Sequence, residues 1–155
     1  MAGKLQQEIK QTKPFSSLQE EAFLNLWRSS DYLFQGLNEA LKPAGLSGTQ
    51  YNILRILRGA GPEGLACREI GERLITRDPD LTRLLDRMEQ RELAVRCREQ
   101  RDRRVVTVRI APKGLEILEE LDARIPEILR EQFRNFDEER LKLLIELLES
   151  LRREE

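Results

Sequence analysis

Five arginines lie within nine residues of this chain, in the segment RCREQRDRR at positions 96–104. A guanidinium group keeps its charge at physiological pH and presents a planar set of N–H donors. It can pair with phosphate oxygens or, through two parallel hydrogen bonds, with the edge of a guanine base. The chemistry that this segment predicts is the binding of a nucleic-acid duplex, if neighbouring elements hold it at the surface.

The residues before the arginine run have the pattern of a short amphipathic helix, which we call the reader helix. Asp78 is expected to cap it, with Pro79 at its first position, where a missing N–H costs nothing. Apolar residues then recur at helical spacing on one face: Leu81, Leu84, Leu85 and Met88. The opposite face carries Thr82, Arg83, Asp86 and Arg87. Such a polar face can reach base edges in a major groove.

The arginine run itself lies between two predicted strands. After it, Val106, Val108 and Ile110 point to one side of a strand, and Val105, Thr107 and Arg109 to the other. A reader helix followed by a basic hairpin is typical of a winged helix-turn-helix, whose hairpin can reach a neighbouring minor groove. The sequence therefore predicts a mainly α-helical fold with a small β-hairpin wing.

Composition argues against several other classes of protein. The chain has 155 residues, enough for one domain with a core. It has no apolar run that could span a membrane, no signal-peptide pattern and only two cysteines, so a cytoplasmic protein is expected. Histidine is absent, which removes the commonest general base and zinc ligand. Since phosphate-loop and nucleophile motifs are also absent, we expect no enzyme, no catalytic residues, no cofactor and no metal.

The net charge of −1 conceals an uneven distribution. Residues 1–67 carry 7 basic and 6 acidic groups, residues 68–109 carry 12 and 9, and residues 110–155 carry 8 and 13. The three segments therefore have net charges of +1, +3 and −5. Positive charge coincides with the reader helix and the wing, and a local patch determines the attraction of phosphates more than the overall balance does.

Further helices are expected on both sides of this unit. One covers residues 16–41, Ser47 opens a second with Gln50 in a capping-box arrangement, and Pro112 and Asp137 open two C-terminal helices with apolar stripes. These stripes could pack on their own domain, but a dimer interface is favoured because DNA operators are commonly two-fold symmetric. The predicted division is a flexible N-terminus (1–15), a dimerisation helix (16–45), a winged helix-turn-helix lobe (46–111) and C-terminal dimerisation helices (112–155).

Four stretches carry a family resemblance: LSGTQYNILRIL (46–57), REIGERL (68–74), LTRLLDRMEQREL (81–93) and DRRVVTVRIAPKG (102–114). Through them the chain resembles the multiple-antibiotic-resistance regulator (MarR) family of bacterial transcription factors. The resemblance implies a homodimer with one winged helix-turn-helix lobe per subunit. It also implies a repressor that a small phenolic or lipophilic ligand, or oxidation, releases from DNA.

Three positions depart from the family pattern. Glu92 stands where the family usually has glycine after the reader helix, and a left-handed conformation there costs a non-glycine residue about 1 kcal/mol. Ala66 and Ala111 precede helices without a capping oxygen, which weakens each helix end by about 1 kcal/mol. These departures concern local stability and leave the predicted fold unchanged.

Candidate DNA contacts lie on the reader helix, on the wing, and on the short helix (66–75) and turn (76–78) that precede the reader helix. They are Asp80, Thr82, Arg83, Asp86 and Arg87 on the helix, Arg101, Asp102, Arg103 and Arg104 on the wing, and Arg73 and Arg77 as phosphate contacts. Thr82 and Arg83 are placed to reach base edges, although the same face could be an ordinary solvated surface. The resemblance implies that Asp102 orients Arg104 toward the minor groove. Arg101 and Arg103 are equally good candidates for the tip.

Two further groups of residues have alternative interpretations. Trp27, Tyr32 and Tyr51 fall where the long helices meet the lobe, and the resemblance implies an effector cleft there, although aromatic residues at helical spacing are more often core. Cys67 and Cys97 each have arginine neighbours that could lower the pKa of a thiol, but inert cysteines are commoner.

We therefore predict a dimeric, sequence-specific regulator that binds a palindromic operator in double-stranded DNA, with no membrane partner. In this prediction it is a repressor that a small ligand releases. One alternative is a helical protein–protein adaptor whose wing no longer meets DNA, which the nine acidic groups of residues 68–109 would suit. Another is a redox-sensing regulator that acts through Cys67 and Cys97. Only a phosphate binder loses affinity steeply with salt, which distinguishes the first prediction from the adaptor.

Overall fold

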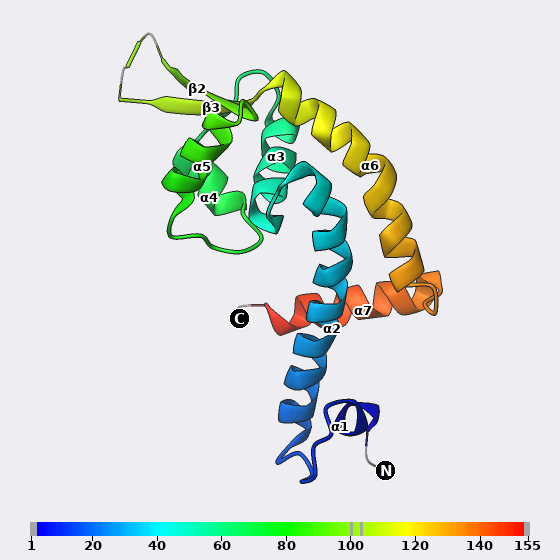
Figure 1. Cartoon of the computed structure of the whole chain (residues 1–155). Coiled ribbons are helices and arrows are strands. Elements are labelled where there is room, and N and C mark those ends of the chain that lie inside the picture. The colour runs from blue at the N-terminus through cyan, green and yellow to red at the C-terminus, as the bar shows by residue number, and fades with distance from the viewer. Residues whose placement is uncertain (1–2, 100, 103, 154–155) are drawn as a thin grey trace.

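The computed structural model describes residues 3–99, 101–102 and 104–153. Its elements, in chain order, are α1 (Lys4–Glu8), α2 (Leu18–Leu41), the 3₁₀ turn η1 (Lys42–Ala44), α3 (Gly48–Ala60), β1 (Leu65–Ala66), α4 (Cys67–Arg73), α5 (Leu81–Gln90), β2 (Ala94–Arg98), β3 (Val106–Ile110), α6 (Pro112–Gln132) and α7 (Glu138–Leu151). The predicted mainly α-helical fold with a hairpin wing is confirmed (Figure 1).

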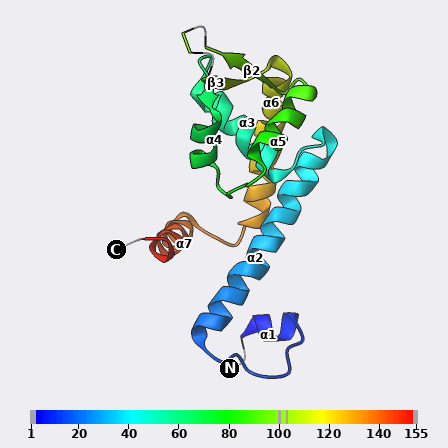
Figure 2. The ribbon, with the colours of Figure 1, turned by 90° about the vertical axis from the view of Figure 1, so that its left-hand side faces the viewer.

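These elements form two regions (Figures 1 and 2). The winged lobe, residues 46–111, contains α3, α4, α5 and the sheet, and the hairpin projects from one of its corners. The helical arm consists of α2, α6 and α7. Helices α2 and α6 lie side by side, and α7 turns away from the end of α6. In the described part of the chain, no helix has the length and hydropathy needed to cross a membrane.

Local signals in the sequence determine where several helices begin. The Ser47 hydroxyl accepts a hydrogen bond from the backbone N–H of Gln50 (3.1 Å), and the Gln50 side chain accepts one from the N–H of Ser47 (3.0 Å). The Asp137 carboxylate likewise accepts from the N–H of Arg140 (2.9 Å). Both predicted caps are confirmed, and each satisfies a backbone donor that the first helical turn leaves free.

The start of the reader helix differs from the prediction. Helix α5 begins at Leu81 with Asp80 at the N-cap position, so Pro79 is not its first residue and Asp78 is not its cap. The Asp78 carboxylate instead accepts a hydrogen bond from the N–H of Asp80 (2.8 Å). This side chain therefore closes a turn two residues before the helix, which is a common alternative use of aspartate.

The sheet has a third strand that sequence analysis missed. Its order is β1-β3-β2 and all pairs are antiparallel, with Leu65 opposite Val108 and Cys97 opposite Thr107. A two-residue strand is too short to show a periodic pattern. Gly64 precedes it with a φ of +71°, and a Cβ there would lie 2.4 Å from the carbonyl oxygen of Val108. Only glycine fits where the loop passes so close to β3.

The core lies in the lobe and continues into the upper part of the arm. Its most completely buried side chains are Leu41, Ile53, Leu54, Leu57, Ile70, Leu85, Met88, Leu93, Val108 and Leu118. The predicted alternation along β3 is confirmed, since Val108 is buried whereas Arg109 is exposed. The apolar residues of the reader helix therefore hold it to the lobe by one face.

The departures from the family pattern have visible consequences. Glu92 does adopt a left-handed conformation, with a φ of +60°. Ala66 and Ala111 provide no capping side chain, although the Glu69 carboxylate accepts from the N–H of Ala66 (2.9 Å). The segment expected to be a flexible N-terminus contains helix α1, in which Leu5 is buried.

Candidate nucleic-acid interface

The reader helix α5 is amphipathic. Leu81, Leu85 and Met88 are buried against the lobe. The polar residues of the opposite face are exposed: Thr82, Arg83, Asp86 and Arg87. Helix α5 and the hairpin lie on the side of the lobe that is turned away from α6 (Figure 1). This face is therefore open to a partner as large as a duplex.

Four arginines on or near the reader helix are available for contacts with a partner. Within the described ranges, none of the salt bridges involves Arg73, Arg77, Arg83 or Arg87, and all four side chains are exposed. Arg73 ends α4, and Arg77 lies in the segment that leads into α5. These four guanidinium groups are therefore available to pair with an anionic partner, while the local positive patch stays a prediction.

The wing tip is shaped by Asp102. Its carboxylate accepts a hydrogen bond from the backbone N–H of Arg104 (3.0 Å), and its carbonyl oxygen accepts from the N–H of Val105 (3.0 Å). Asp102 therefore acts on Arg104 through the main chain. The side chains of Arg101 and Arg104 are exposed at this turn. Arg103, the fourth predicted wing contact, lies outside the described residues.

Arg96 has a role that sequence analysis did not predict. From strand β2 its guanidinium forms an ion pair with Asp86 and donates to the carbonyl oxygen of Thr82 (3.0 Å) on the reader helix. The backbone N–H of Arg96 also donates to the Glu89 carboxylate (3.0 Å). We call this group the Arg96 bracket. It fixes the wing to the reader helix, and it engages Asp86, which was predicted as a DNA contact.

Two further arginines connect the lobe with the arm. Arg91, at the C-cap of α5, donates to the carbonyl oxygens of Ala44 (2.6 Å) and Gly45 (2.8 Å) in the η1 turn that follows α2. Arg58 on α3 pairs with Asp122 on α6, with one contact at 3.1 Å. Hydrogen bonding to Asp122 raises the pKa of Arg58 above its ordinary value. These contacts set the position of the reader helix relative to the arm.

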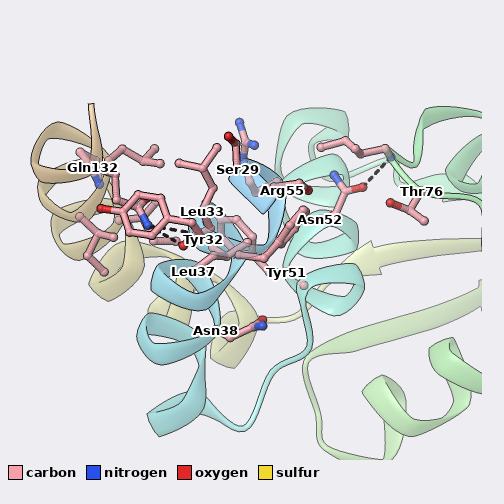
Figure 3. Close-up of a pocket in the computed structure, with 18 of the residues that line it drawn as sticks. Ser29, Tyr32, Leu33, Leu37, Asn38, Tyr51, Asn52, Arg55, Thr76 and Gln132 are labelled. Atoms are coloured by element: carbon pink, nitrogen blue, oxygen red, sulfur yellow. Dashed lines mark hydrogen bonds between the residues drawn. The ribbon is translucent and has the colours of Figure 1, made fainter. Parts of the chain in front are cut away.

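A cavity of about 1220 Å³ lies where the lobe meets the arm (Figure 3). Its lining is mostly apolar and comes from α2, α3, α6, α7 and the segment after α4. Tyr32 and Tyr51 are in its wall, as predicted. Trp27 is outside the lining; it is 65% exposed and packs on Phe23 with ring centroids 5.9 Å apart.

The cavity wall contains a few polar side chains with defined contacts. The Gln132 side-chain nitrogen donates to the carbonyl oxygens of Tyr32 (3.2 Å) and Leu33 (3.4 Å). Its oxygen is buried and has no hydrogen-bond partner in the described part of the chain. Arg55 lies over the ring of Tyr51, 5.8 Å from its centroid. The cavity thus combines an apolar lining with a few fixed polar groups, as small-molecule sites do.

Comparison with known proteins identifies the family of this chain. A model of the MarR family matches residues 44–105. A solved MarR transcription factor from Planctomyces limnophilus is 39% identical, with 87% of this chain and 98% of that chain covered and a TM-score of 0.68. This chain belongs to the MarR family. The family consists of transcription regulators, so the protein is a regulator and not an enzyme.

Other relatives of this MarR-family protein are more distant. The HTH-type transcriptional regulator MhqR of Bacillus subtilis is 26% identical over 126 residues, which cover 81% of this chain and 86% of the relative. A MarR variant from E. coli, solved in complex with operator DNA, is 23% identical with a TM-score of 0.78. It covers 89% of this chain and 100% of its own. At that identity the likeness shows the fold alone.

A redox role for the two cysteines of this MarR-family protein stays a prediction. Cys67 and Cys97 are both free and half-buried. In the described residues, no cluster of three or more acidic, histidine or cysteine side chains could hold a metal ion. The two cysteines belong to different elements, the start of α4 and strand β2.

Proposed function

We propose that this regulator is a homodimeric repressor that binds a two-fold symmetric DNA operator and that a small apolar ligand releases. The observation that carries the proposal is the Arg96 bracket. It joins an exposed reader helix and an exposed basic wing into one unit on the open side of the lobe. A duplex meets both parts of such a unit at once, the helix in the major groove and the wing in the adjacent minor groove.

Individual side chains have different roles in this proposal. Thr82 and Arg83 read base edges, with Arg83 positioned for a two-pronged contact with guanine. Asp80 and Asp86 lie beside them, and Asp86 acts mainly by holding Arg96. Arg73, Arg77 and Arg87 contact phosphates, which position the protein without reading sequence. On the wing, Arg101 and Arg103 meet the backbone, and Asp102 holds the turn from which Arg104 enters the minor groove.

Dimerisation is supported by apolar surface that one chain leaves uncovered. Helix α7 has no buried residue, although it carries Leu143, Ile145, Leu147 and Leu151, which are 54–69% exposed. On α2, Phe23 and Trp27 are also more than half exposed. Large apolar side chains gathered on the surface of a soluble protein often mark a site of protein association. A second copy of the arm would cover it and would place two lobes on one symmetric operator.

Release by a ligand is supported by the cavity between the two regions. Its apolar lining and its aromatic side chains, Tyr32 and Tyr51, suit a phenolic or lipophilic molecule. Because walls from the lobe and from the arm both contribute, an occupant can change the position of one region relative to the other. Such a molecule would favour the arrangement that fits it over the one that fits DNA.

The test is the affinity of the purified protein for a duplex from upstream of its own gene. A shuffled duplex of the same composition is the control. We expect tighter binding to the upstream duplex, and for both duplexes a steep loss of affinity as salt rises from about 50 to 200 mM. Equal affinity for the two duplexes would contradict sequence-specific recognition. Absence of binding to both duplexes at low salt would point to the adaptor alternative.

A further inference from the structure

The segment that leads into the reader helix has few attachments. Ile75 is 78% exposed, and Ile75 and Thr76 both form part of the cavity wall. The backbone N–H of Ile75 donates to the side-chain oxygen of Asn52 at 2.9 Å (Figure 3). Within the described ranges, this is the one hydrogen bond between residues 75–79 and another element. The position of this segment therefore depends strongly on Asn52.

Asn52, unlike the segment 75–79, belongs to a helix that is packed in the core. It lies on α3 between Tyr51 and Ile53, and Ile53 and Leu54 are completely buried in the core. Asn52 also lines the cavity, with Arg55 one turn further along the helix. The Asn52 side chain therefore joins the rigid centre of the lobe to the chain that enters α5. It does so at the cavity surface.

We propose that Asn52 is a positioning residue for the reader helix and that it makes the reader helix sensitive to the contents of the cavity. Its oxygen holds the N–H of Ile75, and this contact fixes the start of α5 in the arrangement that binds DNA. An occupant with a hydroxyl or N–H donor takes the same oxygen and releases Ile75. The inference rests on the proposed DNA binding and adds the donor group that a releasing ligand must carry.

The size of the effect follows from the strength of one hydrogen bond. Its loss changes an equilibrium by about two- to twelvefold. The apolar walls of the cavity give an occupant most of its affinity, and the contact with Asn52 determines its effect on the reader helix. A ligand that binds equally well whether or not Ile75 is held would leave DNA affinity unchanged.

Two variants of the full chain separate the hydrogen bond from the shape of the side chain. Asn52→Leu keeps the size and removes the acceptor, whereas Asn52→Asp keeps an acceptor oxygen. We expect Asn52→Leu to weaken binding to the upstream duplex about three- to tenfold. Asn52→Asp should bind as the wild type does once the salt-dependent effect of its added charge is measured at two salt concentrations. Wild-type affinity in Asn52→Leu would overturn the proposal.

Amide hydrogen exchange tests the same contact without DNA. In the wild type, the amide of Ile75 should exchange more slowly than those of Thr76 and Arg77, and Asn52→Leu should abolish the difference. Equal exchange at all three amides of the wild type would overturn the proposal even if a variant failed to fold. If slow exchange is found but the wild type does not bind the duplex, the proposed function fails and the Asn52 contact stands.

The role of the occupant is tested with phenol and anisole, which have similar rings but differ in the hydroxyl donor. Phenol at millimolar concentration should accelerate exchange at Ile75 and weaken DNA binding in the wild type, and anisole should do neither. In Asn52→Leu, phenol should have no further effect on either measurement. An equal effect of the two compounds in the wild type, or no effect of phenol, would overturn this part of the proposal.

Discussion

The winged lobe and the helical arm bury their apolar residues to very different degrees. In the lobe, Leu54, Leu85 and Met88 are almost completely buried, so the stripes of α3 and α5 meet inside one chain. In the arm, α7 buries none of its residues, and Trp27 on α2 is mostly exposed. The same kind of leucine-rich helix thus completes a core in one region and leaves it open in the other. The lobe closes a core within one chain, whereas the arm leaves apolar side chains exposed, which is the surface that the proposed dimer would cover.

Polar contacts join the two regions. Arg91 reaches from α5 to Ala44 and Gly45, and Arg58 reaches from α3 to Asp122. Arg58 contacts α6 of the arm, and Arg91 contacts the η1 turn directly after α2, while both arginines belong to the lobe. A change in the arm can therefore reach the reader helix through a few directed hydrogen bonds, in addition to packing.

The largest effect is expected from charges on the uncovered face of α7. Leu143→Glu combined with Leu147→Glu should raise the dimer dissociation constant more than a hundredfold. Burial of one leucine is worth about 1.5–3 kcal/mol, and each subunit loses two. Sedimentation measures the change, with Glu149→Gln as a control on the same helix. If the double variant remains as dimeric as the control, this face of α7 is not the interface.

A comparable but separate effect is expected in the lobe. Leu54→Ala should lower the free energy of unfolding by about 2–5 kcal/mol, because it leaves a cavity in a completely buried site. Denaturant unfolding measures the loss. Dimerisation at temperatures where the lobe stays folded should be unchanged. A large change in dimer affinity without a loss of stability would show that the two regions are not separate.

A substitution at the junction between the two regions should have a smaller effect. Arg91→Ala removes two hydrogen bonds from a charged donor and should cost about 1.5–3 kcal/mol in stability. It should also weaken DNA binding, because the end of α5 loses its attachment to the arm. Arg91→Lys, which keeps the charge but not the forked geometry, should recover only part of the loss. Full recovery by lysine would mean that charge alone matters at this position.

A substitution on the exposed face of the reader helix should weaken DNA binding and leave stability unchanged. Arg83→Ala should weaken operator binding by about 1–3 kcal/mol and relax the preference at one base position in each half-site. Its Tm should change little, since the side chain is exposed. An early-melting variant that kept its sequence preference would show that Arg83 is structural.

The smallest effect is expected at the wing tip. Arg101→Ala should weaken binding to all duplexes alike and reduce the slope of log affinity against log salt by about 0.9, the value for one phosphate contact. Because the Arg101 side chain is exposed, the Tm of the variant should stay unchanged. A salt series on operator and shuffled duplexes measures the slope. An unchanged slope would remove Arg101 from the interface.

Features that depend on nearby residues could be predicted from the sequence. The stripe of Leu81, Leu85 and Met88 and the capping box of Ser47 and Gln50 each lie within eight residues, so periodicity and spacing contain the information. The left-handed Glu92 followed from the family pattern. Asp78 and Pro79 were misleading because a turn and a helix start use the same residue types.

Contacts between distant residues could not be predicted in this way. Arg96 meets Asp86 across a helix end and a turn, Asn52 meets Ile75 across 23 residues, and Arg91 reaches Gly45 across 46. An arginine or asparagine at the surface has the same sequence signature whether it binds a neighbour or a ligand. The sequence therefore identified the exposed face of the interface but not the contacts that hold it in place.

The most direct test of the account is the mass of the complex between the protein and a duplex from its own upstream region. Native mass spectrometry of the wild type should show two chains on one duplex, because the arm pairs the lobes and each lobe occupies one half-site. The Leu143→Glu and Leu147→Glu double variant should lose this two-chain complex at the same concentrations. A wild-type complex with one chain per duplex would contradict the proposal that the arm exists to join two DNA-reading lobes.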